Sequence, residues 1–97
     1  MKKYFFIEES PYHNGYYSLR LDFDKIGFGE LKGSANVFPA RLLGLQYADY
    51  LRFCRDNYNA TLFGKGRKYP VPLFKDKSKG NSLCTMLNKE FEKFFEV

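Results

Sequence analysis

Residues 3–23, KYFFIEESPYHNGYYSLRLDF, decide the fold of this chain. From residue 16 to residue 23, apolar and polar side chains alternate, as they do in a strand with one buried face. Residues 4–7 are apolar on both faces, which favours a central strand at 3–8. Between these runs, Pro11 and the pair Asn14-Gly15 indicate a turn with positive φ. The stretch therefore predicts an N-terminal β-hairpin.

Two amphipathic helices are predicted after the hairpin. The first covers about 39–57, where Pro39 suits the first turn because its missing N–H would be unpaired there anyway. The second covers about 82–96, with Asn81 or Ser82 as its cap. Its apolar stripe consists of Leu83, Met86, Leu87, Phe91, Phe94 and Phe95.

Short strands are predicted at 60–63 and 69–74, with a weaker one at 26–32 that Gly27 and Gly29 interrupt. Pro70 and Pro72 remove two N–H groups from the same edge of their strand, which places that strand at the outside of a sheet. Together these elements predict a single α+β domain over residues 1–97. An antiparallel sheet packs against the two helices.

Composition favours one compact folded unit. The 97 residues are 44% hydrophobic and 20% aromatic, which a disordered chain would not be. The N-terminal apolar run ends at Glu8, too early for a secretory signal or a membrane span, so a cytoplasmic protein is expected. Cys54 and Cys84 both lie in apolar helical patterns and are expected to be buried free thiols.

The whole net charge of +5 lies in residues 64–80, GKGRKYPVPLFKDKSKG. The segment contains six basic residues and one acidic residue. Tyr69 lies among them in the sequence, and its ring could stack on bases. We call this set the basic ribbon: Lys65, Arg67, Lys68, Lys75, Lys77 and Lys79. It predicts contact with nucleic acid or with a nucleic-acid-binding protein complex. Two solvated turns that aid solubility explain the same residues.

A second group of cations lies on the exposed face of the first predicted helix. Arg41, Arg52 and Arg55 project within about 60° of one another at helical spacing. Asp49 and Asp56 are close enough in sequence to pair with Arg52. The stripe is therefore either a partner-binding surface or an ordinary solvated face.

The residues offer little for catalysis. The single histidine, His13, lies in the predicted turn without a partner to tune it, and neither cysteine has a histidine nearby in sequence. GKGRK at 64–68 is followed by prolines and not by the helix that a phosphate-binding loop requires. Asp22, Asp24 and Glu30 are too scattered for a metal site. We expect no enzyme, no metal and no cofactor.

Residues 40–53, ARLLGLQYADYLRF, resemble the centre of helix-turn-helix DNA-binding motifs. The matching positions are the small residue, the turn glycine and three apolar residues: Ala40, Gly44, Leu45, Tyr50 and Phe53. The resemblance implies that Gln46, Asp49 and Arg52 face the major groove and that residues 61–74 form a wing. Pro39 would fall inside the first helix of the motif, so a continuous helix that tolerates Gly44 is preferred.

Three functional hypotheses follow from these features. The first is a non-enzymatic protein that lays its basic ribbon on nucleic acid, with the helix-turn-helix interpretation as a variant. The second is a stand-alone inhibitor or adaptor of a host protein complex. Mobile elements use short single-domain chains without a catalytic constellation against host nucleoprotein enzymes, and anti-CRISPR proteins are an example. The analogy depends on size and on that absence, not on a motif. The third, an enzyme, would pair His13 with Glu8, Glu9 or Asp22 in a cleft.

Overall fold

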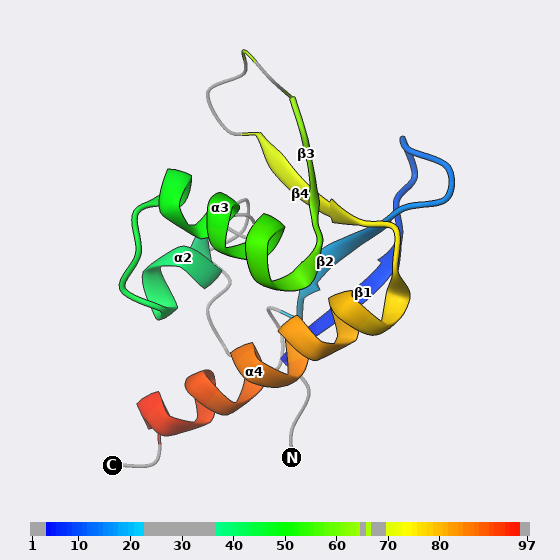
Figure 1. Cartoon of the computed structure of the whole chain (residues 1–97). Coiled ribbons are helices and arrows are strands. Elements are labelled where there is room, and N and C mark those ends of the chain that lie inside the picture. Colours follow the sequence, from blue (N-terminus) through cyan, green and yellow to red (C-terminus); the bar gives the residue numbers. More distant parts are fainter. Residues whose placement is uncertain (1–3, 23–36, 65, 67–69, 96–97) are drawn as a thin grey trace.

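The computed structural model describes residues 4–22, 37–64, 66 and 70–95 of the chain. Within these residues one antiparallel sheet of strand order β1-β2-β4-β3 packs against three helices (Figure 1). The elements are β1 (Phe5–Glu9), β2 (Tyr17–Leu21), α2 (Phe38–Leu42), α3 (Tyr47–Tyr58), β3 (Thr61–Phe63), β4 (Val71–Phe74) and α4 (Lys77–Phe95). The predicted α+β class is confirmed. The weak strand predicted at 26–32 lies outside the described residues.

The predicted N-terminal hairpin is confirmed, but β1 lies at the edge of the sheet and not at its centre. Phe5 pairs with Leu21, and both are buried in the core. The opposite face is open, because Phe6 is 39% exposed and Glu8 forms an ion pair with Arg20 there (Nε to Oε1, 2.6 Å). The prediction of a strand covered on both faces is therefore wrong for β1.

The outer edge of β1 is closed by a side chain from α4. Oδ1 of Asn88 accepts hydrogen bonds from the Tyr4 N–H (2.9 Å) and the Phe5 N–H (2.7 Å). Its Nδ2 donates to the Phe5 carbonyl at 3.2 Å. Asn88 is the one buried polar residue in the described core, at 4% exposure. Its amide makes the hydrogen bonds that a neighbouring strand would make, so these backbone groups are not buried without partners.

The helix predicted over 39–57 is two helices, α2 and α3, which do not continue one another (Figure 1). Gly44 has φ +71°, a left-handed conformation that ends α2. The Gly44 N–H donates to the Arg41 carbonyl (3.1 Å) and the Leu45 N–H donates to the Ala40 carbonyl (2.8 Å). These two bonds form a Schellman motif, which satisfies the free carbonyls at the helix end. Gln46 is then extended and precedes α3.

We expect Gly44→Ala to lower the free energy of unfolding by about 1 kcal/mol, because an L-residue is strained at this positive φ. An added Cβ would meet nothing within 4 Å, so the cost comes from the backbone alone. Gly44→Asn should cost less than half as much, because asparagine tolerates the left-handed region. Urea unfolding measures both variants. Equal losses for Ala and Asn would contradict the proposed backbone cause.

The last helix begins five residues earlier than predicted. Asp76 caps α4, and its Oδ1 accepts hydrogen bonds from the Ser78 N–H (2.9 Å) and the Ser78 hydroxyl (2.7 Å). The hydroxyl bond is the main reason that the pKa of Asp76 is held below its usual range. A lowered pKa in the folded state means that this stabilisation is present near neutral pH and is lost as the pH falls through that pKa. The predicted caps Asn81 and Ser82 therefore lie inside the helix.

The first turn of α4 was not predicted because it contains Gly80. It lies within α4, where glycine normally weakens a helix. A Cβ at this position would lie 3.1 Å from Ile7 Cδ1 and 3.4 Å from Phe74 Cγ. The glycine thus lets α4 approach β1 and β4 closely.

β4 lies between β2 and β3, so the outer position predicted from Pro70 and Pro72 is wrong. β4 pairs with β3 from Val71 to Leu73, but with β2 only through Leu73 and Phe74. Because Pro72 cannot donate, its pairing with a β3 residue is a non-hydrogen-bonded one, and its nitrogen faces β2. Pairing with β2 therefore stops at Leu73. We call the gap between β2 and β4 beyond this point the sheet opening.

Both cysteines are buried free thiols, as predicted. Burial raises the pKa of Cys54 and of Cys84 to about 12. Thiols held in this neutral form are poor nucleophiles at neutral pH, and they fill the core between the sheet and the helices.

Candidate nucleic-acid interface

The exposed side of α3 carries two of the cations predicted as site residues, Arg52 and Arg55. Tyr50, Leu51 and Cys54 turn inward and are buried. The residues on the other side are all exposed: Gln46, Ala48, Asp49, Arg52, Arg55 and Asp56. Arg41 is likewise exposed on α2. The three arginines predicted as site residues therefore all reach solvent, and we call the exposed residues of α2 and α3 the helical face.

The arginines of α3 are paired with acids of the same helix. A nitrogen of the Arg52 guanidinium donates to Asp49 Oδ1, as the sequence predicted. Arg55 pairs with Asp56 (Nε to Oδ1, 3.0 Å), whereas the sequence pattern predicted that Asp56 could pair with Arg52. All four side chains are about half exposed. Such surface pairs contribute little stability, so a phosphate or a base edge can replace the carboxylate at small cost.

β3 and β4 form an arm that lies on the α3 side of the β1–β2 hairpin (Figure 1). The Tyr47 hydroxyl, at the start of α3, donates to the Pro70 carbonyl and so joins the helix to the arm. Burial raises the pKa of Tyr47 to about 12, which keeps this donor neutral. Gly64 and Gly66 both have positive φ where the chain leaves β3. The predicted site residues Lys65, Arg67, Lys68 and Tyr69 lie outside the described residues.

The other half of the basic ribbon lies at the opposite end of β4. Lys75 follows that strand, and Lys77 and Lys79 are in the first turn of α4, all three exposed. Lys77 Nζ lies 5.8 Å from the centre of the Tyr17 ring on β2. In Figure 1 the start of α4 lies beside β1 and β2, away from α2 and α3. The structure therefore does not place these lysines with the helical face.

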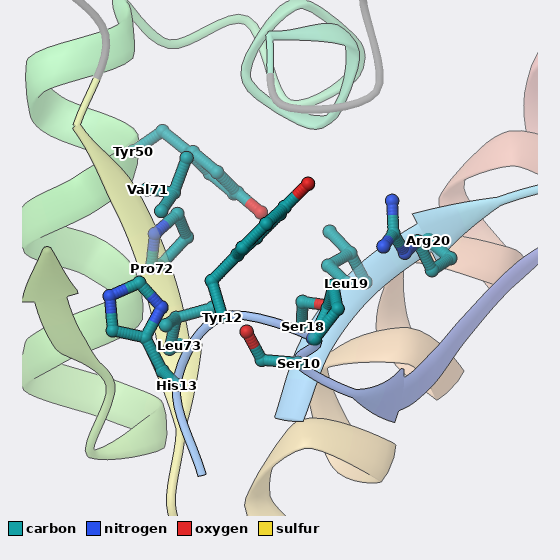
Figure 2. Close-up of a pocket in the computed structure, with 11 residues that line it drawn as sticks. Ser10, Tyr12, His13, Ser18, Leu19, Arg20, Tyr50, Val71, Pro72 and Leu73 are labelled. Atoms are coloured by element: carbon teal, nitrogen blue, oxygen red, sulfur yellow. The ribbon is translucent and has the colours of Figure 1, made fainter. Parts of the chain in front are cut away.

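A pocket of about 260 Å³ occupies the sheet opening, and nothing in the sequence pattern predicted it (Figure 2). Its walls come from the turn after β1, from β2, from β4 and from Tyr50 of α3. The one sequence feature related to the pocket is the two-residue spacing of Pro70 and Pro72. That spacing correctly removed hydrogen bonds from one edge of β4, but it did not show that another strand would lie opposite.

Tyr50 lies behind the inner wall of this pocket (Figure 2), and its hydroxyl is covered. Tyr50 is 0% exposed, and its hydroxyl has no hydrogen-bond partner among the described residues. The Cys54 thiol is close enough to affect the pKa of Tyr50, but a thiol is only a weak hydrogen-bonding group. Burial is the main cause that raises the pKa of Tyr50 well above its ordinary value, with Cys54 adding to it. The hydroxyl is a neutral buried polar group left unsatisfied.

We expect Tyr50→Phe to raise the free energy of unfolding by about 1 kcal/mol, because removing an unsatisfied buried hydroxyl removes its desolvation cost. Tyr47→Phe is the matched control. It removes a hydroxyl that does have a partner, and should lower the free energy of unfolding by about 1 kcal/mol. Urea unfolding of both variants gives the two values. A loss of stability in Tyr50→Phe as large as that in Tyr47→Phe would show that the Tyr50 hydroxyl is bonded.

His13 lines the same pocket and is half-buried, with its ring 4.3 Å from that of Phe63. The described lining holds no carboxylate, and Glu8 is engaged by Arg20. Among the described residues there is no cluster of three or more His, Cys, Asp or Glu side chains that suits a metal ion. None of the helices in this described part is long and apolar enough to span a bilayer.

Comparisons with protein-family models, with curated proteins and with solved structures found no match to this chain.

Proposed function

We propose that this protein binds duplex DNA through α2 and α3, with the β3–β4 arm as a second contact. The observation that carries the proposal is the break at Gly44, which separates α2 from α3. Next to this break, Ala48 and Asp49 in the first turn of α3 are exposed. In helix-turn-helix proteins the first helix crosses the DNA backbone. The N-terminal part of the second helix reaches base edges in the major groove.

The pattern of burial supports the same assignment. Ala40 is 1% exposed and Tyr50 is 0% exposed, as expected for the small and apolar positions that hold the two helices of such a motif together. Gln46, Asp49 and Arg52, the positions that the motif turns toward DNA, are all exposed. The proline that argued against the motif is accommodated, because Pro39 sits at the start of α2, where proline is favoured.

Each exposed group has a role in this proposal. Arg52 and Arg55 leave their acids to contact phosphates or guanines, since arginine suits both. Asp49 holds Arg52 in place until DNA arrives, and its charge opposes the approach of phosphates. Arg41 on α2 contacts the phosphate backbone.

The sequence that joins β3 to β4 is basic. The sequence between Gly64 and Pro70 contains three basic residues, and the hydrogen bond from Tyr47 to Pro70 fixes the base of the arm next to the start of α3. A duplex that receives α3 in one groove would thus have its neighbouring backbone within reach of the arm. Neutralising about four to six phosphates in total gives a slope of about −4 to −5 for log K against log salt.

Fluorescence anisotropy with a labelled duplex, a labelled single strand and several salt concentrations tests the proposal. We expect tighter binding to the duplex, with a salt slope of about −4 to −5. Absence of duplex binding at low salt would contradict it. The adaptor hypothesis predicts instead a stable complex with a protein in nuclease-treated lysate while free duplex is ignored, so a pull-down with and without nuclease separates the two.

We expect Asp49→Asn to tighten duplex binding by about threefold to tenfold, because it removes a negative charge from the helical face and releases Arg52. Glu90→Gln is the matched control. Glu90 pairs with Lys93 on α4 at the same three-residue spacing (3.1 Å), away from the helical face. Anisotropy titrations measure both variants. Equal gains for the two would show a general charge effect and not a role for Asp49 at the interface.

A further inference from the structure

The backbone of β1 directs alternate residues toward β2 and away from the sheet. The Tyr4 carbonyl accepts a hydrogen bond from the Asp22 N–H on the side of β2 (2.8 Å). Because backbone groups alternate in direction along a strand, the even-numbered residues of β1 face β2. Ile7 and Glu9 therefore direct their N–H and C=O groups outward, at the free edge of the outermost strand (Figure 1).

Asn88 covers this edge only at Tyr4 and Phe5, where β1 begins. Among the described residues, none forms a hydrogen bond with the outward groups of Ile7 and Glu9. Ile7 is half-buried and Glu9 is exposed, so these groups lie at the surface. An edge strand with free donors and acceptors can take up a further strand.

A groove of about 260 Å³ lies beside this edge, between β1 and α4. Ile7 forms its wall on β1, and Asn81 and Thr85, both exposed, line it on α4. The Ile7 side chain points toward α4, since its Cδ1 lies 3.1 Å from the position of a Cβ on Gly80. In an antiparallel pair, opposite residues place their side chains on the same face. A side chain opposite Ile7 would therefore enter the groove.

Glu9 indicates the charge of the added strand. It is exposed and forms no ion pair with a described residue. Lys77 lies over the ring of Tyr17, which is the neighbour of Glu9 on β2, but it does not pair with Glu9. Glu9 shares a face with Ile7, because side chains repeat every two residues. A basic residue opposite Glu9 would thus meet an unpaired carboxylate.

A second copy of this chain does not suit the edge. With Phe5 held by Asn88, one antiparallel register pairs both free residues, with Ile7 of each copy opposite Glu9 of the other. That register places the two Glu8 side chains directly opposite each other, and like charges there are destabilising. The edge therefore favours a strand from a different protein.

We propose that the outer edge of β1 binds an extended segment of another protein as an added antiparallel strand, with a basic residue opposite Glu9 and an apolar residue opposite Ile7. The basic residue comes first in the segment, and one residue separates the two. The segment leaves the edge at Phe5, whose backbone groups are taken by Asn88. This site goes beyond the proposed DNA binding, since it uses none of the helical face.

The probe is the peptide Thr-Lys-Thr-Val-Thr, acetylated at its N-terminus and amidated at its C-terminus. Its lysine lies opposite Glu9 and its valine opposite Ile7. Titration of ¹⁵N-labelled protein should give saturable shifts at the amides of Ile7, Glu9 and Thr85, with a Kd on the order of 1 mM for so short a strand.

Two N-methylated peptides test the backbone pairing. In the proposed register the valine N–H donates to the Ile7 carbonyl, so methylation of that nitrogen should weaken binding at least about fivefold. The N–H of the middle threonine points away from β1. Its methylation is the matched control and should change the Kd by less than about twofold. Equal losses for the two peptides would overturn the proposed pairing.

Glu9→Gln tests the charge, because it keeps the backbone groups of the edge. It should weaken binding of the probe about threefold and leave unchanged a peptide with threonine in place of lysine. The proposal is overturned if the probe does not saturate, if its shifts lie elsewhere, or if Glu9→Gln weakens both peptides equally. Self-association with shifts at Ile7 and Glu9 before peptide is added would overturn it in favour of a second copy. All these results are read without DNA, so they do not depend on the outcome for the proposed function.

Discussion

Asn88→Ala should lower the free energy of unfolding by about 3 kcal/mol. The substitution removes three hydrogen bonds and leaves the N–H groups of Tyr4 and Phe5 without their acceptor at the covered edge of β1. Each buried donor left unsatisfied costs about 1–3 kcal/mol, and the truncated side chain also leaves a small void. Urea unfolding at neutral pH measures the loss.

Asn57→Ala is the control for this effect. Asn57 also donates to a backbone carbonyl, that of Phe53 at 3.1 Å, but it lies on the exposed side of α3. Its removal should change the free energy of unfolding by less than about 0.5 kcal/mol, as is usual at the surface. Similar losses for the two variants would mean that Asn88 does not hold β1 against α4.

Arg52→Ala is expected to weaken duplex binding by about 1–3 kcal/mol, or roughly fivefold to hundredfold. The substitution removes the cation nearest the middle of the exposed side of α3, while the ion pair that it breaks contributes little to folding. If Arg52 contacts a phosphate, the salt slope should also fall by about one unit. Anisotropy titrations over a range of salt give both quantities.

Lys93→Ala is the corresponding control. Lys93 is a paired, exposed cation on α4, like Arg52 on α3, but it lies outside the helical face. Loss of one positive charge anywhere weakens binding slightly, so the two variants are compared under the same conditions. Equal losses would indicate attraction by net charge and would contradict a specific place for Arg52.

The N-terminal hairpin could be predicted because its information is local. Alternation over residues 16–23 fixes which face of β2 is buried, and Leu19 and Leu21 lie in the core accordingly. The end of α3 was also predictable. Asn59 takes up the left-handed conformation with φ 55°, which asparagine tolerates better than most residues.

The break between α2 and α3 could not be read from the apolar pattern. Ala40 on α2 and Tyr50 on α3 are buried in the same core, so the pattern of apolar residues runs through the turn as though the helix continued. The two helices are separated by the positive φ of Gly44, but glycine is also compatible with a helix interior at modest cost. Whether the chain forms one helix or two depends on the Schellman hydrogen bonds and on packing.

The position of β4 shows a second limit. Pro72 correctly predicted an edge without donors, but the sequence does not say which strand lies opposite that edge. The pocket could not be predicted either, because it forms where β2, β4 and Tyr50 meet, and these are brought together only in the folded chain. Of the predicted site, the exposure of Arg41, Arg52 and Arg55 followed from helical periodicity. The separation of Lys75, Lys77 and Lys79 from them did not.

Titration of the ¹⁵N-labelled protein with a short duplex is the most direct test of the central claim that α3 meets DNA. We predict that the largest amide shifts fall on the exposed start of α3, at Gln46, Ala48, Asp49 and Arg52, with smaller ones at Arg41. Shifts confined to Lys75, Lys77 and Lys79 at the start of α4 would instead support the basic ribbon, and would contradict the proposed role of α3 in DNA binding.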